Sequence, residues 1–198
     1  QGWKIPESLQ SSYLPALESV CEKRPSADVT LDQALATPLT NLRRVLYILS
    51  EISLEKKRII FLGDDDWTSA CLALVLKRLE VESLQYLEIV VLDIDARIVA
   101  ALNSWSEDEK VSLKAVRHDL RQVEALYPIG YADAVFTDPP YTEPGLNLFC
   151  GWARRLLSRQ GKLFLCYPRR DPETHYKVEE IWHHHGFTLE DYRQGWNQ

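Results

Sequence analysis

The sequence predicts an α/β protein with a doubly wound, mostly parallel sheet, and three observations lead to this class. The chain has 198 residues, of which 45% are hydrophobic and 26% charged, and this is the balance of one globular domain. After the first 57 residues, short apolar runs alternate with stretches of helical periodicity, which is typical of parallel strands joined by crossover helices. The apolar runs are nearly continuous, as strands covered on both faces require.

Residues 1–52 are predicted to form an N-terminal helical extension. Three prolines interrupt the first part of this extension, which favours short helical pieces rather than strands. In the rest of the extension, apolar residues recur at spacings of three and four, which is typical of an amphipathic helix or a broken pair of helices. Thr37 and Pro38 would provide its cap and its first-turn proline.

Residues 53–198 are predicted to form the sheet domain, without an internal repeat or a linker. The apolar runs that predict its strands span residues 58–62, 88–92, 111–116, 132–136 and 162–167. The segments with helical periodicity span residues 68–79, 96–105, 146–157 and 173–185. Strands and helices therefore alternate along the whole domain.

Charge and composition restrict the partner and the compartment. Twenty-nine acidic against 23 basic residues give a net charge of −6, which repels a phosphate backbone and attracts cations. We therefore expect a small cationic substrate rather than a nucleic acid. No apolar run approaches the roughly 20 residues of a membrane span, and we expect no membrane partner. The absence of a leader and of Cys-x-x-Cys spacing among four cysteines favours a cytoplasmic protein, and a homodimer is compatible with the sequence.

Carboxylates follow each of the first four predicted strands. In an open α/β sheet, ligands bind beyond the carboxyl ends of the strands, where these residues would meet. The residues are Gly63-Asp64-Asp65-Asp66 after the first strand, Asp93 and Asp95 after the second, Asp119 after the third, and Asp138-Pro139-Pro140-Tyr141-Thr142 after the fourth.

An acid after the second strand is where the ribose of a nucleoside is usually bound, so Asp93, with Asp95 next, is the candidate for this contact. Asp119 would suit the exocyclic amine of an adenine. The chain thus has a glycine turn at Gly63, then these acids, and then an Asp-Pro-Pro-Tyr segment. This order resembles the S-adenosylmethionine-dependent methyltransferase superfamily. The resemblance implies a Rossmann-like fold of the methyltransferase type.

The turn after the first strand departs from that superfamily. Asp65 occupies the position of a second glycine, which would normally let the backbone approach the methionine part of the cofactor. Three adjacent acids would repel the cofactor carboxylate and hold a cationic amine. Decarboxylated S-adenosylmethionine carries a sulfonium and an ammonium but no carboxylate, and it fits such a turn. The alternative is that the acids only begin a helix, and we expect one of them to cap it.

Six motifs lie along residues 24–196, and they are Arg24-Pro25, Asp32-Gln33, Thr37-x-x-Thr40-x-x-Arg43-Arg44, Gly63-Asp64-Asp65-Asp66, Val91-Leu92-Asp93-Ile94-Asp95 and Thr137-Asp138-Pro139-Pro140. Together these motifs resemble a more specific family, the branched-chain polyamine synthases. The resemblance implies an aminopropyltransferase that moves the aminopropyl group of decarboxylated S-adenosylmethionine to a polyamine such as spermidine, giving a branched polyamine and methylthioadenosine.

The resemblance implies that the acidic turn lies at the reacting amine, with Asp65 as the catalytic base. Amine attack needs an unprotonated nitrogen, whereas free polyamines are protonated near neutral pH, and a carboxylate can accept that proton. Neighbouring acids raise its pKa toward the working range. The expected roles are catalysis for Asp65 and Asp138, cofactor binding for Gly63, Asp64, Asp93, Asp95 and Asp119, and substrate binding for Asp66, Pro139, Tyr141 and Thr142.

Two alternatives stay open at this point. The Asp-Pro-Pro-Tyr segment could bind an exocyclic amine of a base in RNA or DNA, which predicts an N-methyltransferase that uses S-adenosylmethionine. A third reading is a degenerate fold that only binds a partner. We expect no metal site, because the three histidines 183–185 would point in different directions on a helix, without a carboxylate or cysteine at ligand spacing.

Overall fold

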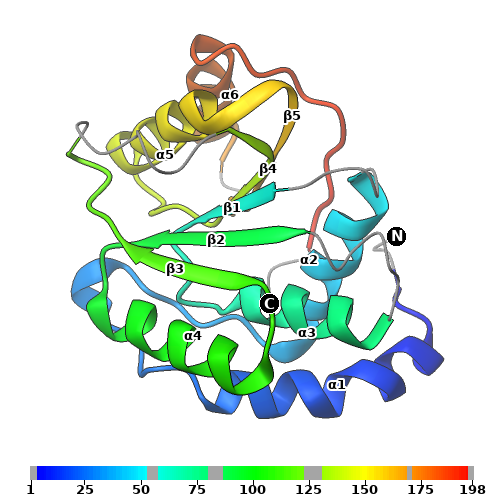
Figure 1. Cartoon of the computed structure of the whole chain (residues 1–198). Coiled ribbons are helices and arrows are strands. Elements are labelled where there is room, and N and C mark those ends of the chain that lie inside the picture. Colours follow the sequence, from blue (N-terminus) through cyan, green and yellow to red (C-terminus); the bar gives the residue numbers. More distant parts are fainter. Residues whose placement is uncertain (1–3, 53–57, 80–86, 123–130, 169–170, 196–198) are drawn as a thin grey trace.

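A five-stranded parallel sheet forms the centre of the computed structural model, which describes residues 4–52, 58–79, 87–122, 131–168 and 171–195 (Figure 1). The strand order is β3-β2-β1-β4-β5, and each neighbouring pair is parallel. This topology confirms the predicted α/β class. The strands are β1 (Arg58–Leu62), β2 (Glu88–Asp93), β3 (Leu113–Arg117), β4 (Ala132–Thr137) and β5 (Leu157–Leu165).

Helices cover both faces of the sheet (Figure 1). One face carries α1 (Glu7–Glu22), α2 (Pro38–Glu51), α3 (Thr68–Leu79) and α4 (Ala96–Glu109), and the other carries α5 (Glu143–Leu156) and α6 (Pro172–His184). A short 3-10 helix, η1 (Val29–Leu31), lies between α1 and α2. Within the described ranges, every helix is too short or too polar to cross a lipid bilayer.

The N-terminal part differs from the prediction of short helical pieces, because α1 continues through Pro15. Pro15 removes one hydrogen bond, to the carbonyl of Ser11, but both residues are exposed and water can serve that carbonyl. Buried Leu17 and Val20 hold the helix on the opposite side. The prediction was wrong because it counted the proline without the face on which it lies.

Helix α2 is one helix rather than a broken pair, and its start confirms the predicted cap. Thr37 Oγ1 accepts a hydrogen bond of 3.2 Å from the amide of Thr40, and Pro38 occupies the first turn. A cap of this kind contributes about 1 kcal/mol to helix stability.

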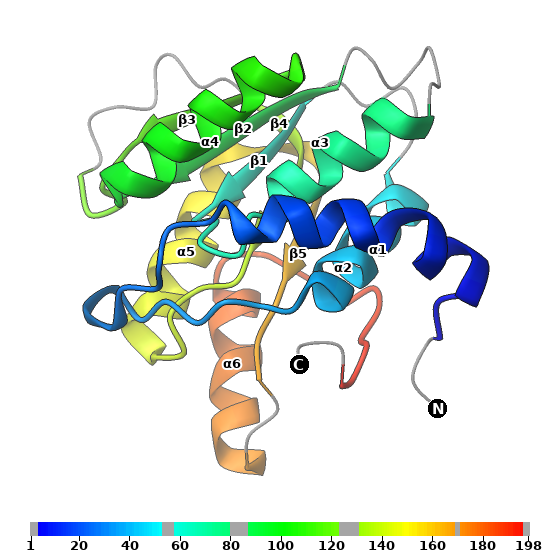
Figure 2. The same cartoon turned by 90° about the horizontal axis from the view of Figure 1, so that it is seen from below.

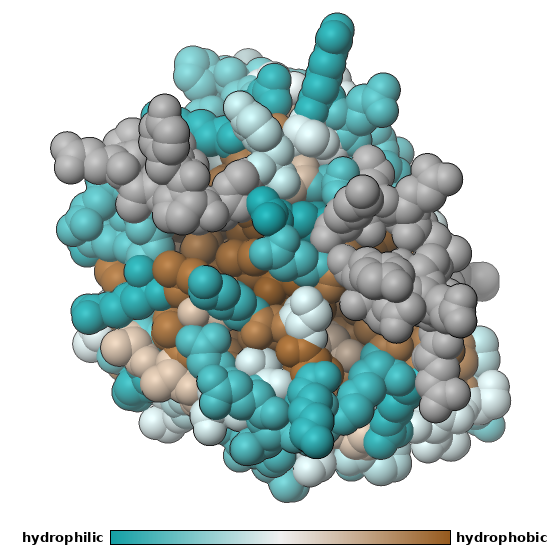
Figure 3. All heavy atoms as spheres, in the orientation of Figure 1, coloured by the Kyte–Doolittle hydropathy of each residue, from teal (hydrophilic) through white to brown (hydrophobic). Residues whose placement is uncertain are grey.

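The two N-terminal helices share one hydrophobic core with the sheet. Leu17 of α1 and Leu42 of α2 are fully buried in the same cluster as Ile59 and Phe61 of β1. The alternate residues of β1 face α5, in a second cluster. Figure 3, in the orientation of Figure 1, shows apolar residues over the middle of the molecule with hydrophilic residues around them. Each large apolar side chain that is fully buried stabilises the fold by about 1.5–3 kcal/mol. The two clusters cover both faces of the sheet, as predicted.

Strand β5 begins five residues earlier than the predicted run at residue 162. Its first half, 157–161, is partly exposed and contains Gly161, so it lacks a continuous apolar run. Among the described strands it lies at the edge of the sheet and pairs with β4 alone, with an irregular register between Ala132 and Ala134. An edge strand needs no continuous burial, and its hydrophobic pattern is therefore weak.

The carboxyl ends of three strands meet at one edge of the sheet. Leu62 of β1 pairs in register with Leu92 of β2 on one side and with Thr137 of β4 on the other. The segments that follow these strands are therefore neighbours, and they carry most of the predicted site residues.

Candidate active site

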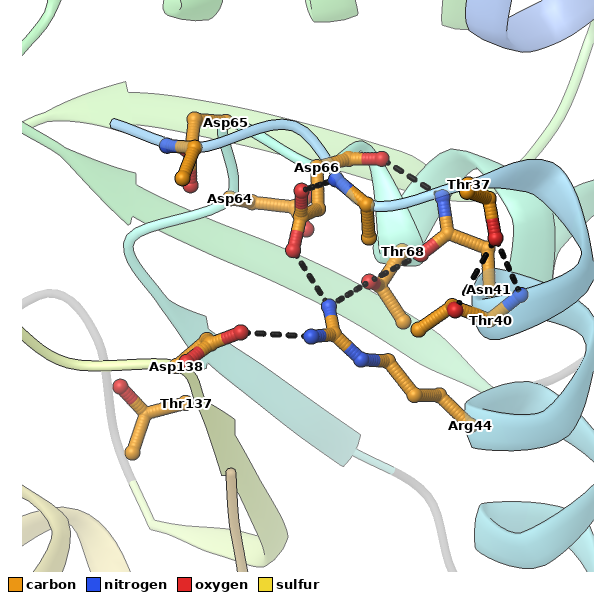
Figure 4. Close-up of polar contacts among 12 residues, drawn as sticks. Thr37, Thr40, Asn41, Arg44, Asp64, Asp65, Asp66, Thr68, Thr137 and Asp138 are labelled. Atoms are coloured by element: carbon orange, nitrogen blue, oxygen red, sulfur yellow. Dashed lines mark hydrogen bonds and ion pairs between the residues drawn. The ribbon is translucent and has the colours of Figure 1, made fainter. Parts of the chain in front are cut away.

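The turn after β1 begins at Gly63, which adopts a left-handed backbone conformation with φ of +67°. Its amide donates a hydrogen bond of 2.8 Å to the carbonyl of Leu92. The turn ends at Trp67, whose φ is +57° and whose side chain is buried beside Trp105. The three acids lie between these two positions, and the turn aims each of them in a different direction (Figure 4).

Asp64 is buried and points toward the start of α3. Its carboxylate accepts hydrogen bonds from the amide of Ser69, at 3.2 Å, and from the Ser69 hydroxyl. Burial raises the pKa of Asp64 well above its usual range. The expectation that one acid of the turn caps the helix is confirmed. The cofactor contact expected of Asp64 stays a prediction, and its side chain is already engaged inside the protein.

Asp66 is also buried, and it binds inward rather than toward an open surface. Its carboxylate forms an ion pair with Arg44 at 2.5 Å and accepts a hydrogen bond from the amide of Ala36. Its own carbonyl accepts from Asn41 Nδ2 at 2.7 Å and from Arg24 Nη1 at 3.2 Å. The substrate contact expected of Asp66 stays a prediction, and both of its carboxylate oxygens are bound by protein groups.

Asp138, directly after β4, faces the acidic turn through Arg44. Its Oδ2 lies 2.5 Å from Arg44 Nη2, and its Oδ1 accepts a hydrogen bond of 2.8 Å from the hydroxyl of Tyr141. Burial raises the pKa of Asp138, and the charge of Arg44 opposes this effect. The Tyr141 ring stands edge-on to Tyr167, at 5.5 Å between centroids. The structure thus brings Asp138 and Tyr141 together beside the turn.

Asp65 forms no ion pair among the described residues and, unlike the buried Asp64 and Asp66, it is only partly buried. Its Oδ2 accepts a hydrogen bond of 3.1 Å from the amide of Ala34. Burial and the negative charges of Asp66 and Asp138 raise the pKa of Asp65 to about 7. A carboxyl group that titrates near neutrality beside other acids is suited to accept a proton from an amine.

Asp93, at the end of β2, fastens two turns together. Its two carboxylate oxygens accept hydrogen bonds from the amide of Asp64, at 2.9 Å, and from the amide of Asp95, at 2.8 Å. Burial raises the pKa of Asp93. The side chain lies next to the acidic turn, as the prediction of a ribose contact requires, but the contact itself stays a prediction.

Asp95 caps α4 rather than facing the acidic turn. Its carboxylate accepts from the amide of Arg97 at 2.9 Å and pairs with the Arg97 guanidinium at 2.6 Å. Gln33 Nε2 donates to its other oxygen at 3.2 Å. The hydrogen bond from Arg97 lowers the pKa of Asp95 to about 2. Asp95 therefore connects the segment before α2 with the start of α4.

Asp119 lies nearer to solvent, after β3. Arg121 binds it with two guanidinium nitrogens, the shorter contact being 2.7 Å, and lowers its pKa to about 2. Arg121 itself is 72% exposed, so the pair is held weakly and can open for a ligand. The adenine contact of Asp119 stays a prediction.

Arg44, Asp65, Asp66, Asp138 and Tyr141 form a group that we call the polar cluster. The remaining residues of the Asp-Pro-Pro-Tyr-Thr segment lie outside it. Pro139 is buried, and Thr142 caps α5 by accepting a hydrogen bond of 3.2 Å from the amide of Gly145. The substrate contact expected of Thr142 stays a prediction, and its hydroxyl caps the helix. Asp138 and Tyr141 are the two side chains of this segment that join the cluster.

Sequence reasoning missed two polar residues of α2, Arg44 and Asn41. Arg44 is 4% exposed and Asn41 is fully buried. Both were missed because α2 was predicted from the spacing of its apolar residues alone. Thr68 Oγ1 donates to Asn41 Oδ1 at 2.9 Å. A signal was present: both residues fall beside Leu42 and Val45 on the buried stripe of the helix, and a buried arginine must have a charged partner.

A comparison with family models matches residues 14–198 to the branched-chain polyamine synthase A C-terminal domain. The chain belongs to this family. An uncharacterized protein of Methanocaldococcus jannaschii is 35% identical over 170 residues, which are 86% of this chain and 41% of that protein. The N(4)-bis(aminopropyl)spermidine synthase of Thermococcus kodakarensis is 32% identical over 152 residues, which are 76% of this chain and 41% of that protein.

A solved structure of a branched-chain polyamine synthase supports the same family. The C9 mutein of the Thermus thermophilus enzyme, in complex with N4-aminopropylspermidine and 5'-methylthioadenosine, superposes with a TM-score of 0.79 at 26% identity, over 93% of this chain and 52% of that chain. The family predicted from the acidic turn and the Asp-Pro-Pro segment is thereby confirmed. The chain spans about two fifths of the length of these curated relatives.

The fold is also that of methyltransferases, as predicted. A putative RNA methyltransferase from Pyrococcus horikoshii has a TM-score of 0.71 at 18% identity, over 93% of this chain and 85% of that chain. An identity this low shows a shared fold, and the reaction must be argued from the site itself.

Proposed function

We propose that the protein is an aminopropyltransferase that moves the aminopropyl group of decarboxylated S-adenosylmethionine to an amine of a polyamine such as spermidine. The products would be a branched polyamine and methylthioadenosine. The observation that carries the proposal is Asp65, a carboxyl group with a pKa of about 7 that forms no ion pair within the described part of the chain. The N4-aminopropylspermidine and 5'-methylthioadenosine named for the Thermus structure fit these products.

The reaction needs a deprotonated amine next to the donor. The amine nitrogen attacks the methylene carbon attached to the sulfonium, the new C–N bond forms as the C–S bond breaks, and the electron pair of that bond goes to sulfur. Asp65 accepts the proton that the polyamine ammonium must lose before the attack, and the nitrogen of the product keeps its remaining proton. Asp65 suits this role because its raised pKa combines a deprotonated population near neutral pH with a useful affinity for the proton.

The donor is proposed to be the decarboxylated form because of the charge around the turn. Asp66 and Asp138 are both close enough to Asp65 for their negative charges to raise its pKa. The carboxylate of intact S-adenosylmethionine would add another negative charge beside them, whereas an ammonium is attracted. In this arrangement Asp93 and Asp119 would contact the nucleoside, and Asp138 with Tyr141 would contact the polyamine.

Methyl transfer to RNA or DNA receives support from the fold alone. The net charge of −6 opposes nucleic-acid binding, and the hydroxyl of Tyr141 is bonded to Asp138. We therefore retain one function. A cytoplasmic location and a homodimer stay predictions.

The experiment is a donor comparison on the intact protein. Spermidine is incubated with decarboxylated or with intact S-adenosylmethionine, and the products are identified by mass spectrometry. We expect aminopropylated spermidine and methylthioadenosine from the decarboxylated donor. A methylated product, or a greater thermal stabilisation by the intact donor than by the decarboxylated one, would reject the proposal.

A further inference from the structure

Arg44 lies at the centre of the polar cluster, between two acids from different parts of the chain (Figure 4). Its Nη1 is 2.5 Å from Asp66 Oδ2, and its Nη2 is 2.5 Å from Asp138 Oδ2. Nη1 also donates to Thr68 Oγ1 at 3.3 Å, and the guanidinium carbon lies 5.6 Å from the centre of the Phe136 ring. The side chain is 3% exposed, so its charge is almost fully removed from water.

This one side chain connects three segments. It projects from α2, contacts the turn after β1 through Asp66, and contacts the loop after β4 through Asp138, which is 94 residues away in the sequence. A buried cation requires compensation, but a single carboxylate supplies one opposite charge. The use of a second acid, whose side chain is still 16% exposed, is not needed for that compensation. The pairing of Arg44 with Asp138 therefore points to a role for both residues on the side of the cluster that is open to solvent.

The pairing assigns different positions to the three acids around the guanidinium. Asp66 is held in the interior, and Asp138 keeps Oδ2 on Arg44 and Oδ1 on the Tyr141 hydroxyl. Asp65 is left without a cationic partner among the described residues. A planar guanidinium can hold two carboxylates at a fixed separation and angle, whereas the ammonium of lysine acts as a point charge.

We propose that Arg44 is a positioning residue for the transfer, which fixes Asp138 and Asp66 so that Asp65 remains the carboxylate open to the reacting amine. The inference rests on the proposed function and adds a specific requirement to it. The fork of Arg44, and not its charge alone, is needed for turnover. Its loss would displace Asp138 and let Asp138 or Asp66 approach the position of Asp65.

The test compares Arg44→Lys and Arg44→Gln with Arg58→Lys in the intact protein. Arg58 is a matched control, because it pairs with Glu88 at 2.7 Å at the opposite end of the strands. We expect Arg44→Lys to lower kcat by about 100-fold, the scale of a small misplacement of a catalytic group, while the Kd for methylthioadenosine changes less than about threefold. Arg58→Lys should keep kcat within about twofold of wild type.

The pH profile separates positioning from a merely structural role. Arg44→Lys keeps the positive charge, so the acid limb of kcat/KM should stay near its wild-type pH. Arg44→Gln removes the charge and should move that limb to higher pH, because a lost cation favours the protonated carboxyl. A carbon-13 titration of the aspartate carboxyl groups should show the same upward change for Asp138 without any turnover.

The outcomes distinguish this inference from the proposed function. Absence of aminopropyl transfer by the wild-type protein rejects the proposed function. Transfer by the wild type with equal kcat for Arg44→Lys and Arg58→Lys rejects the role of Arg44 alone. A loss of kcat in Arg44→Lys accompanied by an equal loss of methylthioadenosine binding also rejects it, because it indicates general structural damage. If Arg44→Gln does not fold, Arg44→Lys decides the matter.

Discussion

The amide of Ala34 donates a hydrogen bond of 3.1 Å to Oδ2 of Asp65, 31 residues further along the chain. Ala34 belongs to the segment 24–37, which we call the strap. In Figure 2 the strap leaves α1, turns at η1 and returns to α2. The main-chain amide of Ala36 donates to Asp66, and the side-chain Nε2 of Gln33 donates to Asp95, so the strap reaches the segments after both β1 and β2. The proposed base is therefore held by a segment that precedes the sheet.

Replacing Asp65 by asparagine should abolish turnover while the nucleoside still binds. The amide keeps an acceptor for Ala34 but cannot take a proton from an amine. General-base catalysis contributes about 10²–10⁴-fold, and we expect a loss of kcat of this size. The measurement is single-turnover product formation together with calorimetric binding of methylthioadenosine. Asp108→Asn, an exposed position on α4, serves as the control, and equal activity of the two variants would contradict the assignment.

The raised pKa of Asp65 also predicts how stability depends on pH. Its folded-state pKa of about 7 exceeds the unfolded value of about 3.9, so between these values the folded state holds a proton that the unfolded state has released. The contribution of Asp65 to stability is complete below pH 4 and is lost as pH rises through 7. Asp65→Asn should therefore gain stability relative to wild type between pH 5 and pH 8, as measured by urea unfolding. A constant difference over this range would disagree with the assigned pKa.

Tyr141→Phe should weaken the use of the polyamine while donor binding persists. The substitution removes the hydroxyl that donates to Asp138 at 2.8 Å and keeps the ring against Tyr167. A hydrogen bond to a charged group is worth about 1.5–3 kcal/mol, so we expect kcat/KM for spermidine to fall by at least about tenfold. Tyr131→Phe, at a residue that is 74% exposed, is the matched control. The prediction fails if the two variants have the same kcat/KM.

Leu17→Ala should destabilise the whole protein, because α1 shares its core with the sheet. The side chain is fully buried, and such truncations cost about 2–5 kcal/mol. Thermal unfolding followed by far-UV and near-UV circular dichroism should show one transition at a lower Tm. Val29→Ala, at a residue that is 84% exposed, should leave Tm nearly unchanged. A separate early transition of helical signal would show that α1 unfolds independently of the sheet.

Elements with one dominant signal could be predicted from the sequence. The runs that became β1 and β2 are buried on both faces, and their hydrophobic pattern is therefore uninterrupted. The first half of β5 is an exposed edge and carried no such pattern. Helix α5 begins at Glu143, three residues before the predicted start, and Thr142 provides its cap. Its first turn is polar, so the hydrophobic pattern that was used to predict the helix begins later than the helix itself.

The acids of the site could be predicted because each follows a strand that ends at the same edge. Arg44 was missed because the helix was predicted from its apolar residues, and an arginine was taken to face solvent although this one lies on the buried stripe of α2. The contacts made by Ala34 and Ala36 were beyond reach for another reason. They use main-chain amides, which nearly every residue type has, so the identity of the residue does not indicate the contact.

The strap's use of main-chain donors has a consequence for protein engineering. At positions 34 and 36, an amino acid that replaces alanine still carries the main-chain N–H group that donates to Asp65 or Asp66. Proline is the exception, since it has no such hydrogen to offer. These two sites can therefore be randomised to change the surface beside the acids, and the main-chain hydrogen bonds to Asp65 and Asp66 are kept.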